Sequence, residues 1–382
     1  MTVYLDYNAT APVRPAVIEA MTEAARRHGN PSSVHGPGRA ARHRIEAARR
    51  TVSALVARDD CDVIFTGSGT EADALAVRGL GRSPVVVSAI EHDAVLAAAP
   101  GARRAPVTAD GVVDLAALEA ILSHDEPGLV CVMWANNETG AVQPVAEIAR
   151  LAHAAGWLFH VDAVQGAGRL DPAALAEADS IALSAHKLGG PPGVGALLVR
   201  DGLAVAPLIA GGGQERGRRS GTENDIGIAG FAVAAQIAAG DREAESRRLA
   251  ALRTRIEAGL RDCAPDIRIA AAATDRLCNT LCVGLPGVAA ETQVMALDLA
   301  GVAVSAGSAC SSGKVKRSHV LEAMFPDDPV AGEAIRISLG WASVEEDCDR
   351  FLRAWGAMRD RLSPAASASN DSIASNDEST AE

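Results

Sequence analysis

The chain has 382 residues, of which 48% are hydrophobic and only 3% aromatic, so Ala, Val and Leu must fill most of its core. This length excludes one small domain and fits two domains, or one large α/β unit with an appendage. The formal net charge of −12 argues against direct binding to nucleic acid.

Neither a targeting segment nor a membrane span is expected. The N-terminal sequence MTVYLDYNATAPV has no basic region followed by an apolar run, and no apolar stretch of 18 residues occurs. The cysteines are odd in number and form no CxxC pair, which favours a reduced, cytoplasmic protein. They are Cys61, Cys131, Cys263, Cys278, Cys282, Cys310 and Cys348.

Short strand-like runs alternate with Ala-rich helical segments over the first half of the chain. Runs such as VVV at 85–87 and LVCVMW at 129–134 are apolar throughout, as is typical of strands covered on both faces. The pattern predicts a largely parallel sheet flanked by helices. In chain order, the expected elements are helices over 15–28 and 37–57; strands at CDVIFTG, PVVVSAI, GLVCVMWA, LFHVDAVQ, SIALSAHK and GALLVR; interleaved helices over 71–80, 114–123 and 144–155; a Gly- and Arg-rich loop over 211–225; and a helix over 226–262, bent near Gly240.

The pattern changes after the long helix. The runs RIAAA, NTLCVGL, VAVSAG and AIRISLG indicate a separate, smaller α+β unit. We therefore expect an N-terminal segment over 1–14 that packs with the small domain, a large domain over 15–250 and the small domain over 251–362. Residues 363–382, SPAASASNDSIASNDESTAE, are of low complexity and are expected to be disordered.

Lys187 lies at the end of a predicted strand, in SAHKLGGPPGVG. A lysine there, beside small residues, can reach into a cleft. Partial desolvation would lower its pKa and suit it to Schiff-base chemistry. The alternative is an ordinary solvated lysine, and this segment alone does not decide between them.

Asp162 lies between apolar neighbours in HVDAVQ, on a predicted central strand. A carboxylate there is costly unless it has a cationic partner. A protonated pyridine nitrogen is one such partner, because pyridoxal phosphate needs that proton to act as an electron sink. The alternative is a helix cap or a buried ion pair.

A third motif, FTGSGTEAD at 65–73, joins a strand to a helix through small residues. Amide groups at a helix start that begins with glycine bind phosphate, although a bare turn is the alternative. Together the three motifs predict a pyridoxal-phosphate site, with a phosphate cradle, a pyridinium partner and a Schiff-base lysine. Each lies at the carboxyl end of a predicted strand, where open α/β sheets bind ligands.

The chain resembles the group I cysteine desulfurases, in class V of the fold-type I pyridoxal-phosphate enzymes. The resemblance covers residues 3 to 355 and rests on ten motifs in order: YLDYNATAPV, GNPSSVHGPGR, TGSGTEAD, EHDAV, NNETGAVQP, HVDAVQ, SAHK, GGGQERGRRSGTEN, GSACSSG and IRISLG. It implies a large domain with a mostly parallel seven-stranded sheet, a smaller α+β domain, and a homodimer.

The resemblance also implies roles for single residues. Lys187 would form the Schiff base, and His92 would stack on the pyridine ring and move protons. Arg336 would bind the substrate carboxylate bidentately, which a lysine would do less well. The other implied contacts are Asp162 to the pyridinium; Gln165 and Asn137 to the ring oxygen; Gly69, Thr70, Ser184 and His186 to the phosphate; Thr222 to the phosphate from the second subunit; and Asn30 in the mouth of the site.

Cys310 lies among Gly, Ser and Ala residues in SAGSACSSGK, where no apolar side chain could pack it into a core. The resemblance implies that it attacks the sulfur of substrate L-cysteine and holds it as a persulfide for a sulfur-acceptor protein, such as an iron–sulfur scaffold. Lys314, Lys316, Arg317 and His319 would favour its thiolate. The alternative is an inert surface thiol; the other six cysteines are expected to be structural.

Two positions depart from the family pattern. Pro192 stands where a basic residue is common, and Trp341 follows SLG where a polar residue is common. Pro192 is expected to change the mouth of the site or a partner surface but not the core chemistry, and the sequence does not explain the effect of Trp341.

Three other functions compete with a desulfurase. An aminotransferase or selenocysteine lyase shares the fold, but a pure aminotransferase needs no Cys310. A silent sulfur-relay subunit would lack Lys187 or Cys310, and both are present. An NAD-binding Rossmann protein is disfavoured because GSGT does not complete G-x-G-x-x-G.

Overall fold

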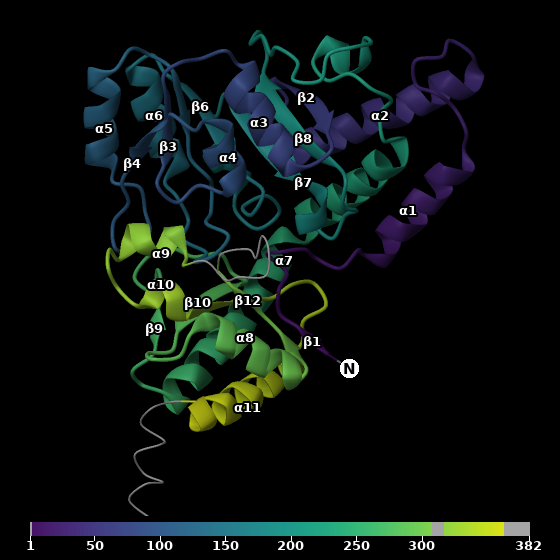
Figure 1. Ribbon diagram of the computed structural model, residues 1–382. Helices are drawn as coiled ribbons and strands as arrows, with labels where there is room; N and C mark the ends of the chain where they lie inside the picture. The colour runs from purple at the N-terminus through teal and green to yellow at the C-terminus, as the bar shows by residue number, and fades with distance from the viewer. Residues whose placement is uncertain (1, 308–316, 363–382) are drawn as a thin grey trace, which may run out of the picture.

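The computed structural model describes residues 2–307 and 317–362. It has a larger part built on a seven-stranded sheet and a smaller part built on a four-stranded sheet, with a long helix, α7 (Asp225–Cys263), running between them (Figure 1). Cys310, Lys314, Lys316 and the C-terminal tail lie outside the described residues.

The large sheet has the strand order β2-β8-β7-β6-β5-β3-β4. β8 runs antiparallel to both of its neighbours, and the other pairs are parallel. The strand bounds are β2 Cys61–Thr66, β3 Val85–Ser88, β4 Arg103–Ala105, β5 Leu129–Cys131, β6 Leu158–Asp162, β7 Ser180–Ser184 and β8 Gly195–Arg200.

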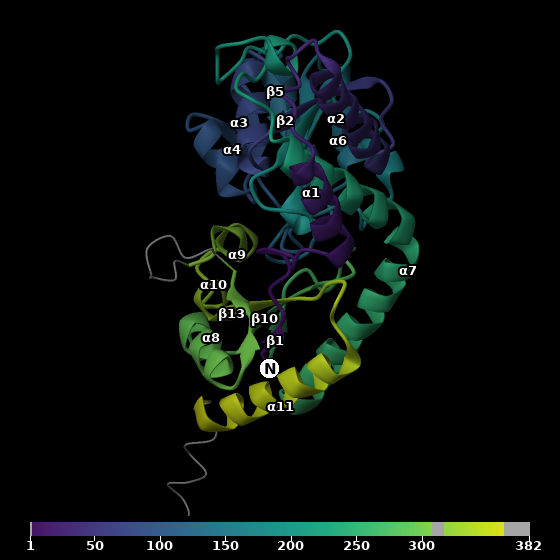
Figure 2. The ribbon, with the colours of Figure 1, turned by 90° about the vertical axis from the view of Figure 1, so that its right-hand side faces the viewer.

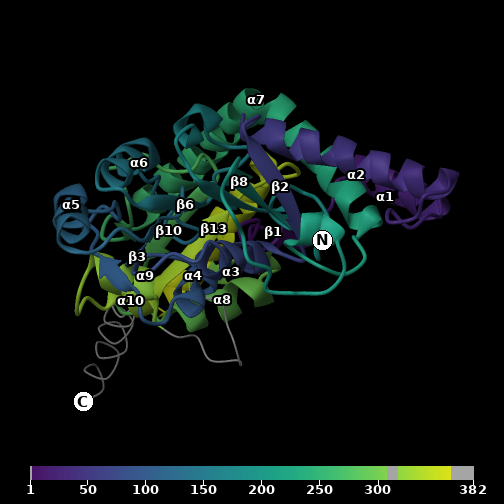
Figure 3. The same cartoon turned by 90° about the horizontal axis from the view of Figure 1, so that it is seen from above.

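Helices cover both faces of this sheet (Figure 3). Helices α2 (Gly36–Leu55), α5 (Leu115–His124), α6 (Val145–Ala154) and the first half of α7 pack on one face. Helices α3 (Gly69–Gly79) and α4 (Asp93–Ala98) pack on the other. Successive residues of a strand point to opposite faces, so Val63 and Phe65 join the first core whereas Ile64 joins the second. This explains why the strands are apolar throughout.

The smaller part has the antiparallel strand order β12-β13-β10-β9. Its core joins the second half of α7 to the sheet and to α11, with Phe351 and Trp355 fully buried. Its elements are β9 Arg268–Ile269, β10 Thr280–Gly284, α8 Ala290–Leu299, β11 Val302–Ala303, β12 Ser305–Ala306, α9 His319–Met324, α10 Val330–Glu333, β13 Ala334–Ser338 and α11 Glu345–Leu362.

The N-terminal segment crosses from one part to the other. Strand β1 (Val3–Tyr4) pairs with β11 in the smaller part. The segment then passes Lys187 and reaches α1 (Pro15–Arg26), which packs against α7. The chain thus enters the larger part only after it has contributed to the smaller one.

The predicted fold class, α/β with a mostly parallel seven-stranded sheet and a smaller α+β unit, is confirmed. The seventh strand, β4, has no counterpart among the predicted strands, because it has three residues and two of them are exposed arginines. Helix α7 is one continuous helix through Gly240, and Figure 2 shows that it is curved. The domain boundary near 250 stays a prediction, since α7 spans it. No helix of the described residues is long and apolar enough to cross a membrane.

Candidate active site

A cavity of about 330 Å³ lies between the two parts, where the carboxyl ends of β5, β6 and β7 face β12 and β13. Open α/β sheets bind ligands at this edge. The cavity brings together most of the residues predicted from the sequence. They are Gly69, Thr70, His92, Asn137, Asp162, Gln165, Ser184, His186, Lys187 and Arg336.

Lys187 ends the short 3-10 helix that follows β7. Its Nζ atom donates to the carbonyl oxygens of Asn8, at 2.6 Å, and Ala9, at 2.8 Å. Burial lowers the pKa of Lys187 to about 8, and the positive charges of Arg336 and Arg169 add to this effect. A substantial fraction of the amine is therefore neutral near pH 8, as nucleophilic attack on a carbonyl requires.

Asp162 is the last residue of β6 and is buried. Within residues 2–307 and 317–362, its one hydrogen-bond donor is the amide of Val164, 2.9 Å from Oδ1. Burial raises the pKa of Asp162, although the charges of His92 and Lys187 oppose the rise. A buried carboxylate that faces a cavity without an ion-pair partner fits a cationic ligand there.

Helix α3 begins in the cavity wall. Ser68 caps it by accepting a hydrogen bond from the amide of Glu71 at 3.1 Å, whereas in the described part of the chain the amides of Gly69 and Thr70 have no protein acceptor. A Cβ atom on residue 69 would lie 3.0 Å from Cγ2 of Val164 and 3.2 Å from Cβ of Ser184, so a side chain at this position would crowd the wall. Free amides at a helix N-terminus suit the phosphate of a ligand.

Two histidines line the same cavity. His92 caps α4, and its Nδ1 atom accepts a hydrogen bond from the amide of Ala94 at 3.1 Å, which leaves Nε2 to carry the proton. His186 lies with Nδ1 3.1 Å from the hydroxyl of Thr10. Burial and the nearby charge of Lys187 lower the pKa of His186 to about 4, so this ring is neutral at pH 7.

Arg336 reaches the cavity from β13 and is 4% exposed. It donates to the carbonyl oxygen of Asn137 at 3.1 Å and to Oδ1 of Asp6 at 2.7 Å. Its buried Nε atom has no partner among the described residues. A guanidinium that lines the cavity is suited to binding a carboxylate.

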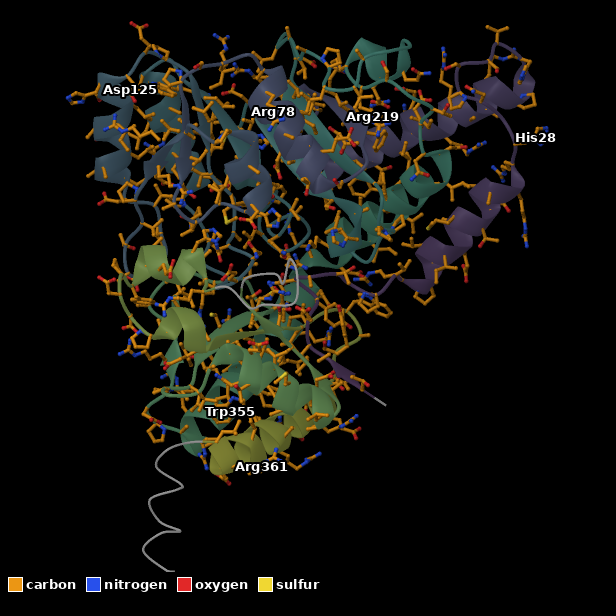
Figure 4. The ribbon with its side chains drawn as sticks, in the orientation of Figure 1. His28, Arg78, Asp125, Arg219, Trp355 and Arg361 are labelled. Atoms are coloured by element: carbon orange, nitrogen blue, oxygen red, sulfur yellow. The ribbon has the colours of Figure 1, made fainter. Side chains whose placement is uncertain are left out.

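Three predicted residues are not brought to the cavity by the described chain. Thr222 is exposed beside a different hollow. Asn30, expected at the mouth, lies instead in the exposed loop after α1, where Figure 4 places His28 far from the cavity. A second subunit would have to bring either side chain to the site. The third, Cys310, lies outside the described residues, although Gly307 lines the cavity.

Sequence reasoning missed Asn8, which organises the site. Its carbonyl oxygen accepts from Lys187 and, at 3.0 Å, from Nε2 of Gln165. Its side chain donates to the carbonyl oxygen of Asn137 and to the hydroxyl of Thr280. The residue belongs to the motif YLDYNATAPV, but nothing local to that motif reveals its distant partners.

Asp73 was also missed. It lines the cavity one turn after Gly69 on α3, and its Oδ1 atom lies 3.2 Å from Nε2 of His160. Nδ1 of His160 lies 2.8 Å from the hydroxyl of Ser180. Burial raises the pKa of Asp73 and lowers that of His160 to about 3. The helical spacing between positions 69 and 73 was the available signal, because residues four apart share a helix face.

The comparisons with known proteins agree with this geometry. A model of the family described as aminotransferase class-V matches residues 3–351. The chain belongs to this family. It is 44% identical to a cysteine desulfurase of Cereibacter sphaeroides, over 94% of this chain and 96% of that one. It is 42% identical to an IscS-like cysteine desulfurase of Mycobacterium tuberculosis, over 91% and 94%. A NifS-like protein from Rickettsia africae shares the fold with a TM-score of 0.87 and 33% identity, over 94% of this chain and all of that one.

Class-V aminotransferases use pyridoxal 5′-phosphate, and the residues of the cavity fit this group. The lysine with a lowered pKa fits the aldehyde. Asp162, which has no ion-pair partner in the described part of the chain, fits the ring nitrogen, and the amides of Gly69 and Thr70 fit the phosphate.

Proposed function

We propose that this chain is a cysteine desulfurase, which converts L-cysteine to L-alanine and transfers the sulfur to Cys310. The observation that carries the proposal is one cavity in which Lys187, Asp162 and Arg336 meet. The names of its relatives support the choice of reaction. Cys310 separates this reaction from plain transamination, which needs no thiol.

Each of these residues of the cavity would have a separate role in the reaction. Arg336 would bind the substrate carboxylate from the wall of the cavity. Asp162 would keep the cofactor's ring nitrogen protonated, and His92 would stack on the ring and hold a proton at Nε2. Lys187 would attach the cofactor and then release it to the substrate amine. The bound cofactor supplies an electron sink that weakens the bond between the substrate's Cβ and its sulfur.

Cys310 would complete the reaction without an external oxidant. Its thiolate attacks the substrate sulfur, so that a bond between two sulfurs forms and the Cβ–S bond breaks. The electron pair of the broken bond stays with the carbon skeleton, which takes up a proton at Cβ and leaves as alanine. The two sulfurs together are oxidised to the same extent as Cβ is reduced.

The other cysteines are poorly suited to this attack. Burial raises the pKa of Cys61 and Cys282 to about 12 and that of Cys348 to about 11, and it also raises those of Cys131 and Cys278. Their thiols stay protonated at neutral pH and are weak nucleophiles. Cys263, by contrast, is exposed and offers a matched control.

The deciding experiment measures alanine released from L-cysteine by holoenzyme with a thiol reductant. We expect alanine and sulfide in a ratio of one to one, and neither product from Cys310→Ala. Cys263→Ala should behave as the parent does. Full activity in Cys310→Ala would overturn the role of Cys310 and favour selenocysteine lyase or transaminase chemistry on Lys187.

Further parts of the proposal concern partners. We infer a cytoplasmic homodimer in which Thr222 of each subunit reaches the other subunit's phosphate. The persulfide would pass to a sulfur-acceptor protein such as an iron–sulfur scaffold. The exposed position of Thr222, beside a hollow other than the active-site cavity, supports the first inference. Sedimentation of the holoenzyme and complementation of Lys187→Ala by Thr222→Ala in mixed dimers would test the shared site.

A further inference from the structure

The ends of the segment that carries Cys310 are described up to Gly307 and from Arg317 onward. Both ends meet one carboxyl group, that of Glu138, which belongs to the larger part. Neither the sequence motifs nor the family comparison assigned a role to this residue. The following inference rests on the proposed desulfurase function.

The first end is fixed by a strand and then by Glu138. Strand β12 pairs with β13 so that Ser305 lies opposite Arg336. The next described residue after the strand, Gly307, packs directly on the carboxyl group. A Cβ atom added to Gly307 would lie 2.4 Å from Oε2 of Glu138, so no side chain fits between them. The segment therefore starts in contact with both Glu138 and the wall of the cavity.

The second end is fixed by Ser318, the N-cap of α9. Its hydroxyl oxygen accepts from the amide of Leu321 at 3.1 Å, which satisfies the start of the helix. The hydroxyl proton is donated to Oε2 of Glu138 at 2.5 Å. The next residue, His319, donates from Nε2 to the carbonyl oxygen of Glu91 at 3.0 Å. The second end is thus tied to the larger part twice.

Glu138 is itself held in place. It is 3% exposed, and its amide donates to Oδ1 of Asn136 at 2.9 Å. Burial raises the pKa of its carboxyl group, while the Ser318 hydroxyl and the charges of His319 and Arg336 oppose the rise. Burying a carboxyl group costs free energy unless its hydrogen bonds are made. An apolar residue would fill this space at a lower cost in free energy than a buried carboxyl group. The contacts of Oε2 therefore indicate that the carboxyl group of Glu138 has a function.

We propose that Glu138 is a positioning residue for sulfur transfer, which holds both ends of the Cys310 segment against the active-site cavity. It acts through the placement of Cys310 and touches neither the substrate nor the cofactor. Its loss should slow the attack on the substrate sulfur and leave cofactor attachment and substrate binding unchanged.

The test compares holoenzymes carrying Glu138→Ala, Glu138→Gln, Ser318→Ala and Ser318→Thr. Glu138→Ala should lower kcat for alanine release about 10- to 100-fold, since small misplacements of a reacting group have effects of this size. The KM for L-cysteine should stay within about twofold, and the cofactor absorption band should not move. Hydrogen exchange in the peptide over 317–324 should speed up.

The conservative variants separate positioning from packing. The amide oxygen of Glu138→Gln can still accept the Ser318 hydroxyl, and Ser318→Thr keeps both the cap and the donor, so both should stay near the parent rate. Ser318→Ala should resemble Glu138→Ala and replaces it if that variant does not fold. Asp114→Ala removes the cap of α5, a remote helix, and should leave kcat unchanged.

Three results would overturn the proposal: a parent-like kcat in Glu138→Ala, a raised KM at unchanged kcat, or unchanged hydrogen exchange over 317–324. A raised KM would place Glu138 in substrate binding through Arg336 instead. A parent holoenzyme that makes no alanine would defeat the desulfurase function itself. Hydrogen exchange would then decide separately whether Glu138 holds the segment's ends.

Discussion

Two cavities meet at Lys187, and they differ in size and in chemistry. The larger one, of about 330 Å³, contains the positions proposed for the phosphate, the pyridinium and the carboxylate. The smaller one, of about 50 Å³, lies behind the lysine and is lined by Arg14, Arg169 and Trp341 among others. One therefore has room for a cofactor and substrate, whereas the other has room for little more than water.

The residues around the smaller cavity hold Lys187 in place and do not form a ligand site. Arg169 is half-buried there and donates to the carbonyl oxygens of Gln165, at 2.7 Å, and Lys187, at 3.1 Å. Trp341 donates to the carbonyl oxygen of Pro12 at 2.9 Å, and the guanidinium of Arg14 lies 5.4 Å from its ring. The departure at Trp341 thus has a structural role in this wall, whereas Pro192 is exposed in a loop and nothing here explains it.

The largest effect is expected on the cofactor side, from Asp162→Asn. Alanine formation should fall about 100- to 1,000-fold, because the amide cannot hold the ring nitrogen protonated. The apoprotein should become more stable at pH 7 by about 1 kcal/mol, because the raised pKa of Asp162 means that its charge is costly in the empty fold.

Urea unfolding of the parent and Asp162→Asn apoproteins at several pH values shows which of the two is more stable. The stability gained by the variant should disappear as the pH falls below the ordinary Asp pKa of about 3.9, because the parent's carboxyl group is then neutral in both the folded and the unfolded state. A less stable variant at pH 7 would show that Asp162 has a second structural partner.

A smaller effect is expected from the rear cavity, through the pKa of Lys187. Only the neutral amine attacks an aldehyde, so the rate of cofactor attachment to apoprotein should rise with pH around a midpoint of about 8. Arg169→Met removes one of the positive charges that lower this pKa, so the midpoint should move up by about one unit.

The attachment rate is followed by absorbance from pH 6 to pH 9.5. Arg27→Met, which removes an exposed arginine from α1's C-terminal end, serves as the control and should not move the midpoint. An unmoved midpoint in Arg169→Met would show that Arg169 does not lower the pKa of Lys187 and would leave burial and Arg336 as its causes.

The smallest effect is expected from Trp341→Phe. The ring stays over Arg14, but the hydrogen bond to Pro12 is lost, so the free energy of unfolding should fall by about 0.5–1 kcal/mol. The kcat should stay within about twofold of the parent, because Trp341 lines only the smaller cavity. A large loss of kcat would give the rear wall a direct part in the chemistry.

The larger cavity was the more predictable of the two. Lys187, Asp162 and Gly69 stand at strand ends, and parallel strands bring such ends together whatever lies between them. A short-range pattern is therefore enough to group them. The same reasoning predicted the sheet, apart from β4, whose exposed arginines give no apolar signal.

Residues defined by distant contacts were not predictable in this way. Glu138 lies in the polar motif NNETG, which suggests a solvated loop, and only the fold buries it beneath Ser318. Asn8 and Trp341 likewise depend on partners hundreds of residues away. Asn30 and Thr222 show a different limit of sequence-based prediction. Both were predicted at the site, but a single chain does not bring them there.

The N-terminal segment has a consequence for how the protein is made. The amide of Asn8 donates to the hydroxyl of Ser338, a residue 330 positions later, at 3.0 Å. Contacts so distant in sequence form late, since the intervening chain must first be ordered. On the ribosome the large sheet can fold early, but the first residues synthesised must wait for nearly the last before Lys187 gains its carbonyl partners. A prematurely terminated chain would therefore carry most of the cofactor-binding residues and still lack a finished site.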